Sequence, residues 1–469
     1  MKDTTKDIFK EKSSAATFEE ALSQASSFGI RPGLETMRAL MDELGNPQER
    51  LPIVHVAGTN GKGSVCALLE SVFRAAGYKT GLYTSPHLVE YGERFRINGH
   101  AAAESILWAL LAKIQAAADR VETKLGWRPT EFELLTAMGF LYFQEEGVDI
   151  LVLEVGMGGK LDATNLAAKP LLTVITNVSM DHENFLGNDI RSIAGEKAGI
   201  IKKGVSLISA VEDPVVQQTV LDRFEEVQGA FDQGPEKDGP ARLHWVLQEC
   251  RWQVISQSVL QQTVKLQTPA YCYERLSLPL IGPHQCINLA TAVRALELLQ
   301  EAYPNLGPAA VENGVGRVSW PGRLEVVCRK PLVILDGAHN PDGMKRLAQW
   351  LQGVRPAFRR VILVIGMLAD KDRQTAAAQL EPLVDRLFIT KPPSYRAVQW
   401  EAMGDAFHQI KPADKAYIED NWIALKAAMD EAELEDLVLV AGSLYLIGSL
   451  KARMNSEPDV LERKDPEFS

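Results

Sequence analysis

Short apolar segments alternate with longer amphipathic segments through most of this chain. LPIVHVAG (51–58), VDILVLEVGMGG (148–159) and LLTVITNVS (171–179) are almost continuous runs of apolar residues. Segments 64–77 and 130–147, which lie beside such runs, carry apolar residues at helical spacing. Continuous apolar strands separated by helices are typical of a parallel sheet that helices cover on both faces. The sequence therefore predicts an α/β fold.

The pattern changes after about residue 210. Segment 229–242 is rich in Gly, Pro and charged residues, and 243–280 alternates polar and apolar residues as antiparallel strands do. A helix is expected at 287–302, and SWPGRLE (319–325) is typical of a linker. A second strand–helix alternation follows, with strands expected at 332–337, 360–367, 385–390 and 436–443. We expect one domain over 1–318 and a smaller α/β domain over 319–469, with a polar tail that frays from about 454.

Composition and charge exclude several classes of function. The chain has 469 residues and a formal net charge of −11, so it has no general attraction to nucleic acid or an anionic membrane. Its five cysteines form no CxxC pair, which argues against a disulfide framework and favours a reduced, cytoplasmic setting. The N-terminal MKDTTKDIFKEK lacks the apolar core of a signal peptide. Apolar runs such as VILVIGML are shorter than the roughly 18–20 residues of a membrane helix.

GTNGKGS (58–64) lies between an expected strand and an expected helix, which is where a phosphate-binding loop belongs. Gly58, Gly61 and Gly63 permit tight turns and a close approach of the backbone to an anion. The N–H groups at the helix start and the Lys62 charge would attract a phosphate. Ser64 is placed to reach a metal ion or a phosphate. The alternative is a glycine-rich turn without a ligand.

Three further residues are ambiguous when each is taken alone. Glu154 lies in an otherwise apolar strand, where a carboxylate is costly unless it is paired or bound to a metal. His182 follows the strand near 171–176, and a lone histidine is more often an ordinary structural residue. Lys197, in GEKAGIIKKG, would by itself be read as a solvated lysine.

These motifs together resemble the folylpolyglutamate synthase/dihydrofolate synthase family of the Mur ligase superfamily. GTNGKGS, TSPHL, VLEVGMGG, DHxxxLG and EKAGIIK are similar to family motifs and occur in family order. The resemblance runs from about 30 to 448. It implies a P-loop-type, mostly parallel N-terminal ATPase domain with a small antiparallel β part, and a smaller Rossmann-like C-terminal domain.

The resemblance also implies a magnesium and carbamate centre. Glu154 and His182, with Ser85 of TSPHL, would be Mg²⁺ ligands, and two Mg²⁺ ions are expected. CO₂ would convert Lys197 to a carbamate, which turns a cation that repels a metal into an anion that positions one. Lys62, Glu154, His182 and Lys197 are thus the expected catalytic residues.

Family segments also suggest where the substrates bind. Thr130 and Glu133 form a T-x-x-E capping box, which explains a helix start without any ligand. The resemblance nonetheless places the pterin-bearing substrate there, where Phe132 is suited to stacking on a flat ring. The implied substrate residues are Arg31, Pro32, Gly33, Thr130, Glu131, Phe132, Glu133, Leu161, Asp162, Ala163 and His339. Lys160 stands where the family usually has arginine, so no bidentate anion clamp is expected there.

The nucleotide is expected to contact both domains. By resemblance, Asn288 in GPHQCINLATA approaches the adenine, Arg323 in WPGRLE reaches the phosphates, and Asp336 in DGAHNP binds the ribose. Taken alone, Asn288 is a helix-surface amide and Arg323 a surface arginine. The implied ATP residues are Asn60, Gly61, Lys62, Gly63, Ser64, Asn288, Arg323 and Asp336.

The implied reaction is ATP-dependent addition of L-glutamate to a folate substrate through an acyl phosphate. The acceptor is dihydropteroate, a reduced folate or both, and we favour both. The alternatives are one of these activities alone, another Mur-type amino-acid ligase, or a nucleotide-binding module without catalysis. A monomer without nucleic-acid or membrane partners is expected.

Overall fold

The computed structural model describes residues 17–457 apart from residues 28, 30, 32, 182 and 230–240. Contacts within this part of the chain define two units. Unit 1 comprises Met1–Gln253, Lys265–Leu276 and Ile287–Val318, and unit 2 comprises Val254–Val264, Ser277–Cys286 and Ser319–Ser469. Among the described helices, none combines the length and apolar character needed to cross a membrane.

Unit 1 contains an 8-stranded sheet, as far as the described residues show, with the order β4-β3-β2-β5-β1-β6-β7-β8. The pairs β2–β3 and β3–β4 are antiparallel, and the remaining pairs are parallel, so the predicted mostly parallel sheet is confirmed. Its strands are β1 (Ile53–Ala57), β2 (Thr80–Tyr83), β3 (Phe95–Ile97), β4 (His100–Ala101), β5 (Ile150–Glu154), β6 (Leu172–Ile175), β7 (Leu207–Ser209) and β8 (Leu243–Trp245).

Four of the described helices that accompany this sheet, α2, α6, α8 and α9, begin after a residue whose side chain caps the helix. Helix α6 begins after Thr130, whose side chain forms the predicted capping box with Glu133. The helices are α2 (Phe18–Ala25), α3 (Glu35–Glu43), α4 (Lys62–Ala75), α5 (Glu104–Leu125), α6 (Glu131–Glu145), α7 (Glu183–Leu186), α8 (Ile190–Ala198), α9 (Pro214–Gln228), α10 (Val246–Glu249), α11 (Pro283–Leu298) and α12 (Pro308–Val315), with the short 3₁₀ turns η1 (Pro47–Arg50), η2 (Tyr91–Arg94) and η3 (Ala163–Leu166).

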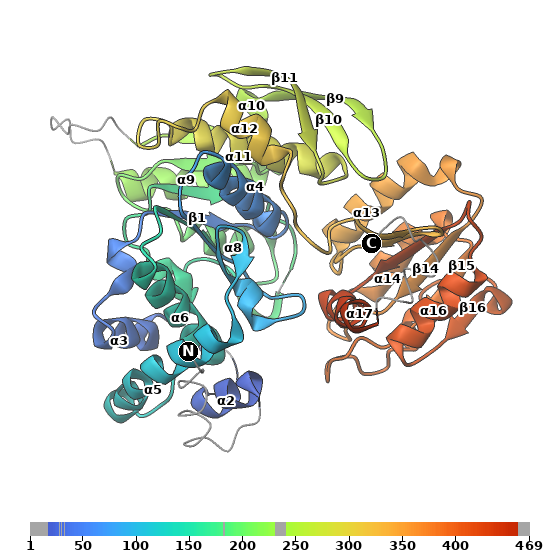
Figure 1. Ribbon diagram of the computed structural model, residues 1–469, viewed down its shortest axis with the longest axis horizontal. Coiled ribbons are helices and arrows are strands. Elements are labelled where there is room, and N and C mark those ends of the chain that lie inside the picture. The colour runs from blue at the N-terminus through green and yellow to red at the C-terminus, as the bar shows by residue number, and fades with distance from the viewer. Residues whose placement is uncertain are drawn as a thin grey trace. The chain divides into compact units, whose positions relative to one another are not determined.

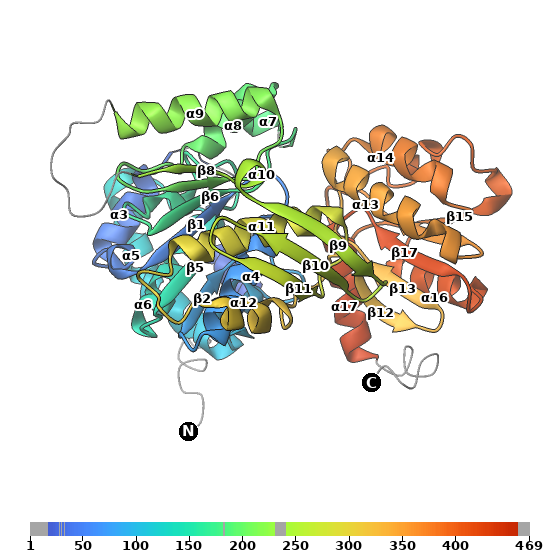
Figure 2. The ribbon, with the colours of Figure 1, turned by 90° about the horizontal axis from the view of Figure 1, so that it is seen from above.

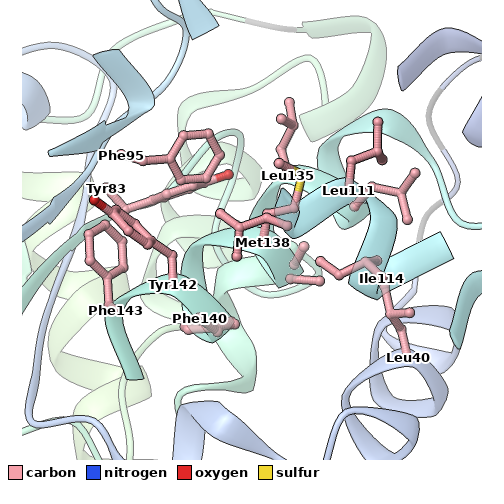
Figure 3. Packing of buried hydrophobic residues seen from close by; sticks show 14 of the residues in the cluster. Leu40, Tyr83, Phe95, Leu111, Ile114, Leu135, Met138, Phe140, Tyr142 and Phe143 are labelled. Carbon is pink, nitrogen blue, oxygen red and sulfur yellow. The ribbon is translucent and has the colours of Figure 1, made fainter. Parts of the chain in front are cut away.

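A large apolar cluster joins α2, α3, α5 and α6 to one face of the sheet. Figure 3 shows the rings of Tyr83 and Phe95 beside each other, with Met138 of α6 next to them and Leu111 of α5 farther along. Leu151 and Leu153 of β5 belong to the same cluster. Because side chains alternate along a strand, Glu154 points to the opposite face, where α4 packs on β1, β2 and β5 (Figures 1 and 2).

The expectation of antiparallel strands over 243–280 is wrong for its first part. Leu243–Trp245 forms β8, which pairs in parallel with β7 and extends the main sheet, and α10 follows it. Only β9 (Arg251–Gln257), β10 (Gln262–Gln267) and β11 (Cys272–Leu278) form the separate 3-stranded sheet in the described chain. Their four-residue connections require antiparallel neighbours. Polar–apolar alternation marks a half-buried strand, whichever direction it pairs in.

Unit 2 contains a second sheet, 6-stranded within the described residues, with the order β12-β13-β17-β14-β15-β16. Only its edge pair β12–β13 is antiparallel. The strands are β12 (Glu325–Arg329), β13 (Leu332–Leu335), β14 (Val361–Ile365), β15 (Arg386–Ile389), β16 (Lys415–Tyr417) and β17 (Leu437–Ala441). The helices are α13 (Pro341–Val354), α14 (Arg373–Leu380), α15 (Ala402–Asp405), α16 (Asn421–Glu431) and α17 (Leu444–Ser456), with η4 (Arg355–Ala357), η5 (Glu381–Leu383) and η6 (Pro412–Asp414).

The C-terminal tail stays helical for longer than expected. Helix α17 continues to Ser456 and buries Met454, so residues 454–456 belong to the last helix, and fraying of the tail stays a prediction. The apolar Met454 side chain packs into unit 2, which holds the last turn in place. Residues 458–469 lie outside the described part.

Candidate active site

The glycine-rich loop between β1 and α4 is held by the segment that follows β6. The N–H of Asn60 donates to Asn177 Oδ1 at 2.7 Å, and the Thr176 hydroxyl donates to the carbonyl oxygen of Asn60 at 2.7 Å. Thr59 exchanges two further hydrogen bonds with the backbone of Ser179. The loop is therefore anchored at the carboxyl ends of two neighbouring parallel strands, which is where α/β sheets bind ligands.

Two glycines of this loop are required by their contacts. Gly58 has φ +152°, and a Cβ atom there would lie 1.9 Å from Thr176 Oγ1. Gly61 has φ +84° and caps α4, and a Cβ atom there would lie 2.5 Å from Asn288 Oδ1. Asn288 is buried on α11, so the interpretation of this residue as a helix-surface amide is wrong. Its side chain lies against the start of α4.

Lys62 and Lys197 converge on the same carbonyl group. Lys62 Nζ donates to the carbonyl oxygens of Gly58 and Thr59, both at 3.1 Å. Lys197 Nζ, from α8, donates to the Gly58 oxygen at 3.0 Å. Lys197 is only 3% exposed, so its reading as a solvated lysine is also wrong.

Burial and charge determine the protonation of this second amine. Burial and, to a smaller extent, the nearby Lys62 charge together lower the pKa of Lys197 to about 7, whereas Asp181 and Asp162 oppose the shift. Near neutral pH a large fraction of the Lys197 side chains is therefore uncharged. An uncharged amine is a nucleophile, which an ammonium group is not.

Glu154 provides a buried carboxylate beside the phosphate loop. It ends β5, in register with Val56 of β1, and only 5% of it is exposed. The backbone N–H of Ser85, which follows β2, donates to Glu154 Oε2 at 3.3 Å. Glu154 and Ser85 thus lie together, as predicted, and Ser64 is buried at the start of α4. These are oxygen donors of the kind that Mg²⁺ prefers.

The third expected metal ligand, His182, lies outside the described residues. Within the described ones, no group of three or more His, Cys, Asp and Glu side chains forms a metal-binding cluster. The donor set of Glu154 and the Ser hydroxyls fits Mg²⁺, which usually takes one or two protein carboxylates and completes its shell with water and substrate phosphate.

Asp162 is held at the start of η3 by three hydrogen bonds. The Met157 N–H donates to Oδ2, and the Thr164 N–H and hydroxyl donate to Oδ1. Burial raises the pKa of Asp162, and these bonds oppose the rise. Ala163 is buried beside it, whereas Leu161 is 44% exposed. Lys160 uses its backbone N–H to bind the Glu196 carbonyl oxygen.

The predicted acceptor segment lies at the start of α6. Thr130 N–H and hydroxyl both donate to Glu133 Oε2, at 2.8 and 2.9 Å, so the capping interpretation is confirmed. Burial raises the pKa of Glu133. The Phe132 ring lies against Gly156, where a Cβ atom would come within 2.3 Å of it. Glu131 accepts a hydrogen bond from the Tyr91 hydroxyl at 3.3 Å.

The N-terminal substrate segment is described only in part. The guanidinium of Arg31 lies over the Trp127 ring, 4.4 Å from its centroid, and its charge acts on Glu133. Gly33 has φ +126°, and nothing lies within 4 Å of the position that a Cβ atom would take there. Pro32 lies outside the described residues. Arg31 therefore lies near the start of α6, as the two substrate segments require.

The remaining predicted residues lie in unit 2. Asp336, after β13, accepts hydrogen bonds from the N–H groups of Leu324 and Ala338, each at 2.9 Å. Burial raises the pKa of Asp336, and the Arg323 charge opposes the rise. Arg323 is half-buried and lies against Gly337, so its interpretation as a surface arginine is wrong. His339 Nδ1 hydrogen-bonds the Gly337 carbonyl oxygen at 2.7 Å.

The sequence interpretation missed the residues that hold the loops. Asn177 and Thr176 hold the phosphate loop, and Glu93 accepts three backbone hydrogen bonds from residues 88–90, which begin with the last residue of TSPHL. One signal was available, because polar residues directly after an apolar strand often belong to a site at the strand end. Nothing in their spacing identified which loop they bind.

Two family models match the chain. The Mur ligase middle domain matches residues 56–296, and the Mur ligase, glutamate ligase domain matches residues 322–444. The dihydrofolate synthase/folylpolyglutamate synthase of Bacillus subtilis (strain 168) is 35% identical over 431 residues, which cover 91% of this chain and 96% of that protein. The protein of the same name from Mycobacterium tuberculosis is 37% identical over 459 residues, covering 92% and 91%.

Solved structures give the same result. The M. tuberculosis folylpolyglutamate synthase complexed with ADP has a TM-score of 0.83 and 33% identity, covering 93% of this chain and 97% of that chain. E. coli FolC in complex with DHPP and ADP has a TM-score of 0.80 and 32% identity, covering 95% and 99%.

Proposed function

The chain belongs to the folylpolyglutamate synthase/dihydrofolate synthase family of Mur ligases, and from this membership we propose its reaction and the residues that perform it. It is an ATP-dependent ligase that adds L-glutamate to folate substrates. We infer that it accepts both dihydropteroate and tetrahydrofolate, as the combined names of two relatives suggest. The observation that carries the proposal is the convergence of Lys62 and the buried Lys197 on the Gly58 carbonyl oxygen of the phosphate loop.

The proposed reaction has two steps. The acceptor carboxylate attacks the γ-phosphorus of ATP, which releases ADP and forms an acyl phosphate. The amine of L-glutamate then attacks the acyl carbon, inorganic phosphate leaves, and the amine proton is lost. A phosphate is a much better leaving group than an oxide, which explains the need for ATP.

The phosphate loop would stabilise the charge that develops during phosphoryl transfer. Lys62 and the N–H groups at the start of α4 are preorganised donors at a helix N-terminus. In the structure Lys62 Nζ is bound to two carbonyl oxygens of the loop. We expect it to exchange one of these bonds for a phosphate oxygen when the nucleotide binds. Asn60, Gly61, Gly63, Ser64 and Asn288 would complete the contacts of unit 1 with ATP.

Glu154, with Ser85 and His182, would hold Mg²⁺. Bound Mg²⁺ would neutralise phosphate charge, and we expect two ions. The chain's own contribution is to keep the Glu154 carboxylate dry and oriented. The Ser85 N–H bond supports this role, because it fixes the carboxylate relative to the TSPHL segment.

We propose that Lys197 is carbamylated. Its uncharged amine would attack the carbon of CO₂, and the nitrogen would then lose a proton to give a carbamate anion. The pKa of about 7 supports this step, because the amine need not be deprotonated first at neutral pH. The carbamate would relieve the repulsion between two amines at Gly58 and would help to position the metal.

Unit 2 would supply Arg323 for the phosphates, Asp336 for the ribose and His339 for the substrate side. Asp336 is rigidly held by two backbone N–H groups, which supports a role in positioning. The acceptor would lie beside Thr130 to Glu133, Leu161 to Ala163 and Arg31 to Gly33. We further propose that the enzyme acts as a monomer in the cytoplasm.

Phosphate release tests the function directly. Purified protein is given ATP, Mg²⁺ and L-glutamate with dihydropteroate, with tetrahydrofolate or with no acceptor, and the products are identified by mass. Lys62→Ala serves as the inactive variant, and Lys79→Ala, an exposed lysine paired with Glu146, serves as the control. Phosphate release with both acceptors supports a bifunctional enzyme, and release with only one acceptor indicates an enzyme that has only that activity. Release with neither, from folded protein that binds ATP, would favour another Mur-type ligase or a non-catalytic module.

A further inference from the structure

Arg94 is a buried arginine without an acidic partner. It ends the short turn η2 immediately before β3, and it is only 9% exposed. Within the described part of the chain, no Asp or Glu carboxylate forms an ion pair with it, although Glu93 precedes it and Glu131 lies nearby. Burying a guanidinium without a counter-charge costs desolvation free energy, so its presence here suggests a function.

The few contacts of Arg94 leave most of its donors unused. Its Nε donates to His87 Nδ1 at 2.9 Å, and its guanidinium lies 5.5 Å from the centroid of the Tyr91 ring. The Nη1 and Nη2 groups have no hydrogen-bond acceptor among the described residues. The Glu131 carboxylate accepts a hydrogen bond from the Tyr91 hydroxyl and forms no ion pair with Arg94 in the described part of the chain.

His87 does not compete for an anion. The Nδ1 atom of His87 acts as a hydrogen-bond acceptor, so it offers no N–H group to an anion. Its Nδ1 accepts the Arg94 hydrogen bond, and its ring lies 4.3 Å from the Tyr91 ring. The two rings and the guanidinium thus form one rigid group, with Arg94 as its positive charge.

This group lies at the end of β2, beside the centre described above. The Arg94 carbonyl oxygen accepts from the Thr84 N–H, and the next residue, Ser85, binds Glu154. The Tyr83 hydroxyl experiences the charges of Arg94, Asp162 and Glu154 together. Tyr91, which packs on Arg94, also contacts Glu131 of the acceptor segment. Contacts therefore connect Arg94 to the segment of the expected metal ligands and, through Tyr91, to the expected acceptor segment.

We propose that Arg94 binds a carboxylate of the acceptor substrate through its Nη1 and Nη2 groups. The inference rests on the proposed function, which supplies an acceptor that carries carboxylates. A guanidinium offers two parallel N–H donors that match the two oxygens of a carboxylate, and a desolvated pair of this kind is strong and directional. The bound anion would supply the counter-charge that the protein does not.

Two acceptors distinguish which carboxylate is bound. Dihydropteroate carries one carboxylate, which is the reacting group, whereas a glutamylated tetrahydrofolate carries a second that does not react. If Arg94 holds the reacting group, its loss weakens binding of both acceptors. If it holds the second group, only tetrahydrofolate is affected. Either result supports carboxylate binding by Arg94.

The decisive experiment measures acceptor binding by calorimetry, with wild type, Arg94→Gln and Arg94→Lys. We expect Arg94→Gln to weaken binding of at least one acceptor by about tenfold to hundredfold, as the loss of a charged hydrogen-bonded pair predicts, with ATP affinity unchanged. Arg94→Lys should keep part of the affinity. Arg96→Gln is the matched control, because it removes the same charge from β3 two residues away.

A carboxamide analogue of the affected acceptor separates recognition from a structural role. In wild type, replacing the bound carboxylate by a carboxamide should weaken binding, and in Arg94→Gln this difference should disappear. Equal losses in wild type and variant, or unchanged affinity of Arg94→Gln for both acceptors, would overturn the inference. If wild type itself neither binds nor ligates either acceptor, the proposed function fails instead.

Discussion

Lys62 of the phosphate loop and Lys197 of α8 donate hydrogen bonds to the same atom, the carbonyl oxygen of Gly58, at 3.1 and 3.0 Å. Two ammonium groups this close repel each other, and the buried one loses most of its hydration. The arrangement therefore favours an uncharged Lys197, and the lowered pKa of its amine is a direct consequence.

Lys197 makes stability depend on pH in a defined direction. The pKa of Lys197 is about 7 when folded and near its ordinary value when unfolded, so between about pH 7 and 10 the unfolded state binds the additional proton. The free energy of unfolding should therefore rise with pH, by at most about 1.4 kcal/mol per unit, in this window. Lys197→Met should lose that slope. Urea denaturation of both proteins at several pH values without CO₂ measures it, and equal slopes would refute the prediction.

Carbamylation predicts dependence on CO₂. Enzyme depleted of CO₂ should lose activity and regain it with bicarbonate, more readily above pH 7, where the Lys197 amine is uncharged. Lys197→Arg keeps a positive charge that cannot add CO₂, so kcat should fall about hundredfold or more and stay low with bicarbonate. Phosphate release measures both effects. Activity that ignores CO₂ removal in wild type would argue against the carbamate.

Gly58→Ala should damage the phosphate loop. The new Cβ atom would meet Thr176 Oγ1 at 1.9 Å, so the loop must shift at a cost of about 1–3 kcal/mol. We expect about tenfold weaker nucleotide binding and partial recovery in the double variant Gly58→Ala/Thr176→Ala. Gly195→Ala on α8 is the control, because nothing lies within 4 Å of its Cβ position. Calorimetric titration with ATP checks the series, and normal binding by Gly58→Ala would contradict it.

Glu154→Gln should weaken the metal site without unfolding it. Glutamine keeps an oxygen that accepts from Ser85 N–H but lacks the charge that attracts Mg²⁺. The Mg²⁺ concentration for half-maximal phosphate release should rise about tenfold to hundredfold. Nucleotide binding in EDTA should stay unchanged, which serves as the internal control. An unaltered Mg²⁺ dependence would remove Glu154 from the proposed ligands.

Asp336→Asn should weaken both stability and nucleotide affinity. The two Asp336 oxygens accept from Leu324 and Ala338, and an asparagine can serve only one of these donors with its oxygen. The loss should be about 1–3 kcal/mol of unfolding free energy, with weaker ATP binding because Arg323 loses its counter-charge. Asp372→Asn, at the exposed start of α14, should change both stability and ATP binding little, because asparagine caps a helix about as well as aspartate does. Thermal unfolding and titration separate the two effects.

Local sequence features predicted much of the fold and the phosphate loop. The apolar runs at 51–58 and 148–159 became neighbouring parallel strands, and the Thr130–Glu133 box begins α6. These features depend on residues that are close together in the sequence, so they can be recognised from the sequence alone. The parallel pairing of β8 could not be predicted in this way. Its partner β7 lies before it in the chain, across an intervening helix, and the alternation of polar and apolar residues does not specify the direction of pairing.

Such local features could not predict the environment of individual side chains. Asn288 and Lys197 each had a plausible surface interpretation, yet one packs against Gly61 and the other bonds Gly58. No sequence feature pointed to Arg94, although it is a buried charge without an ion-pair partner among the described residues. Each of these outcomes depends on segments that are distant along the chain.

The sequence by itself determined which segments form strands and helices, where the phosphate loop lies and which family motifs the chain carries, because periodicity, glycines and caps act locally. Only the tertiary structure decided which polar groups lose their water and which charges face one another. That decision set the pKa of Lys197 and left Arg94 without a counter-ion. Desolvation and Coulomb energy depend on distances in space, and these distances exist only once the sheet and its helices have packed.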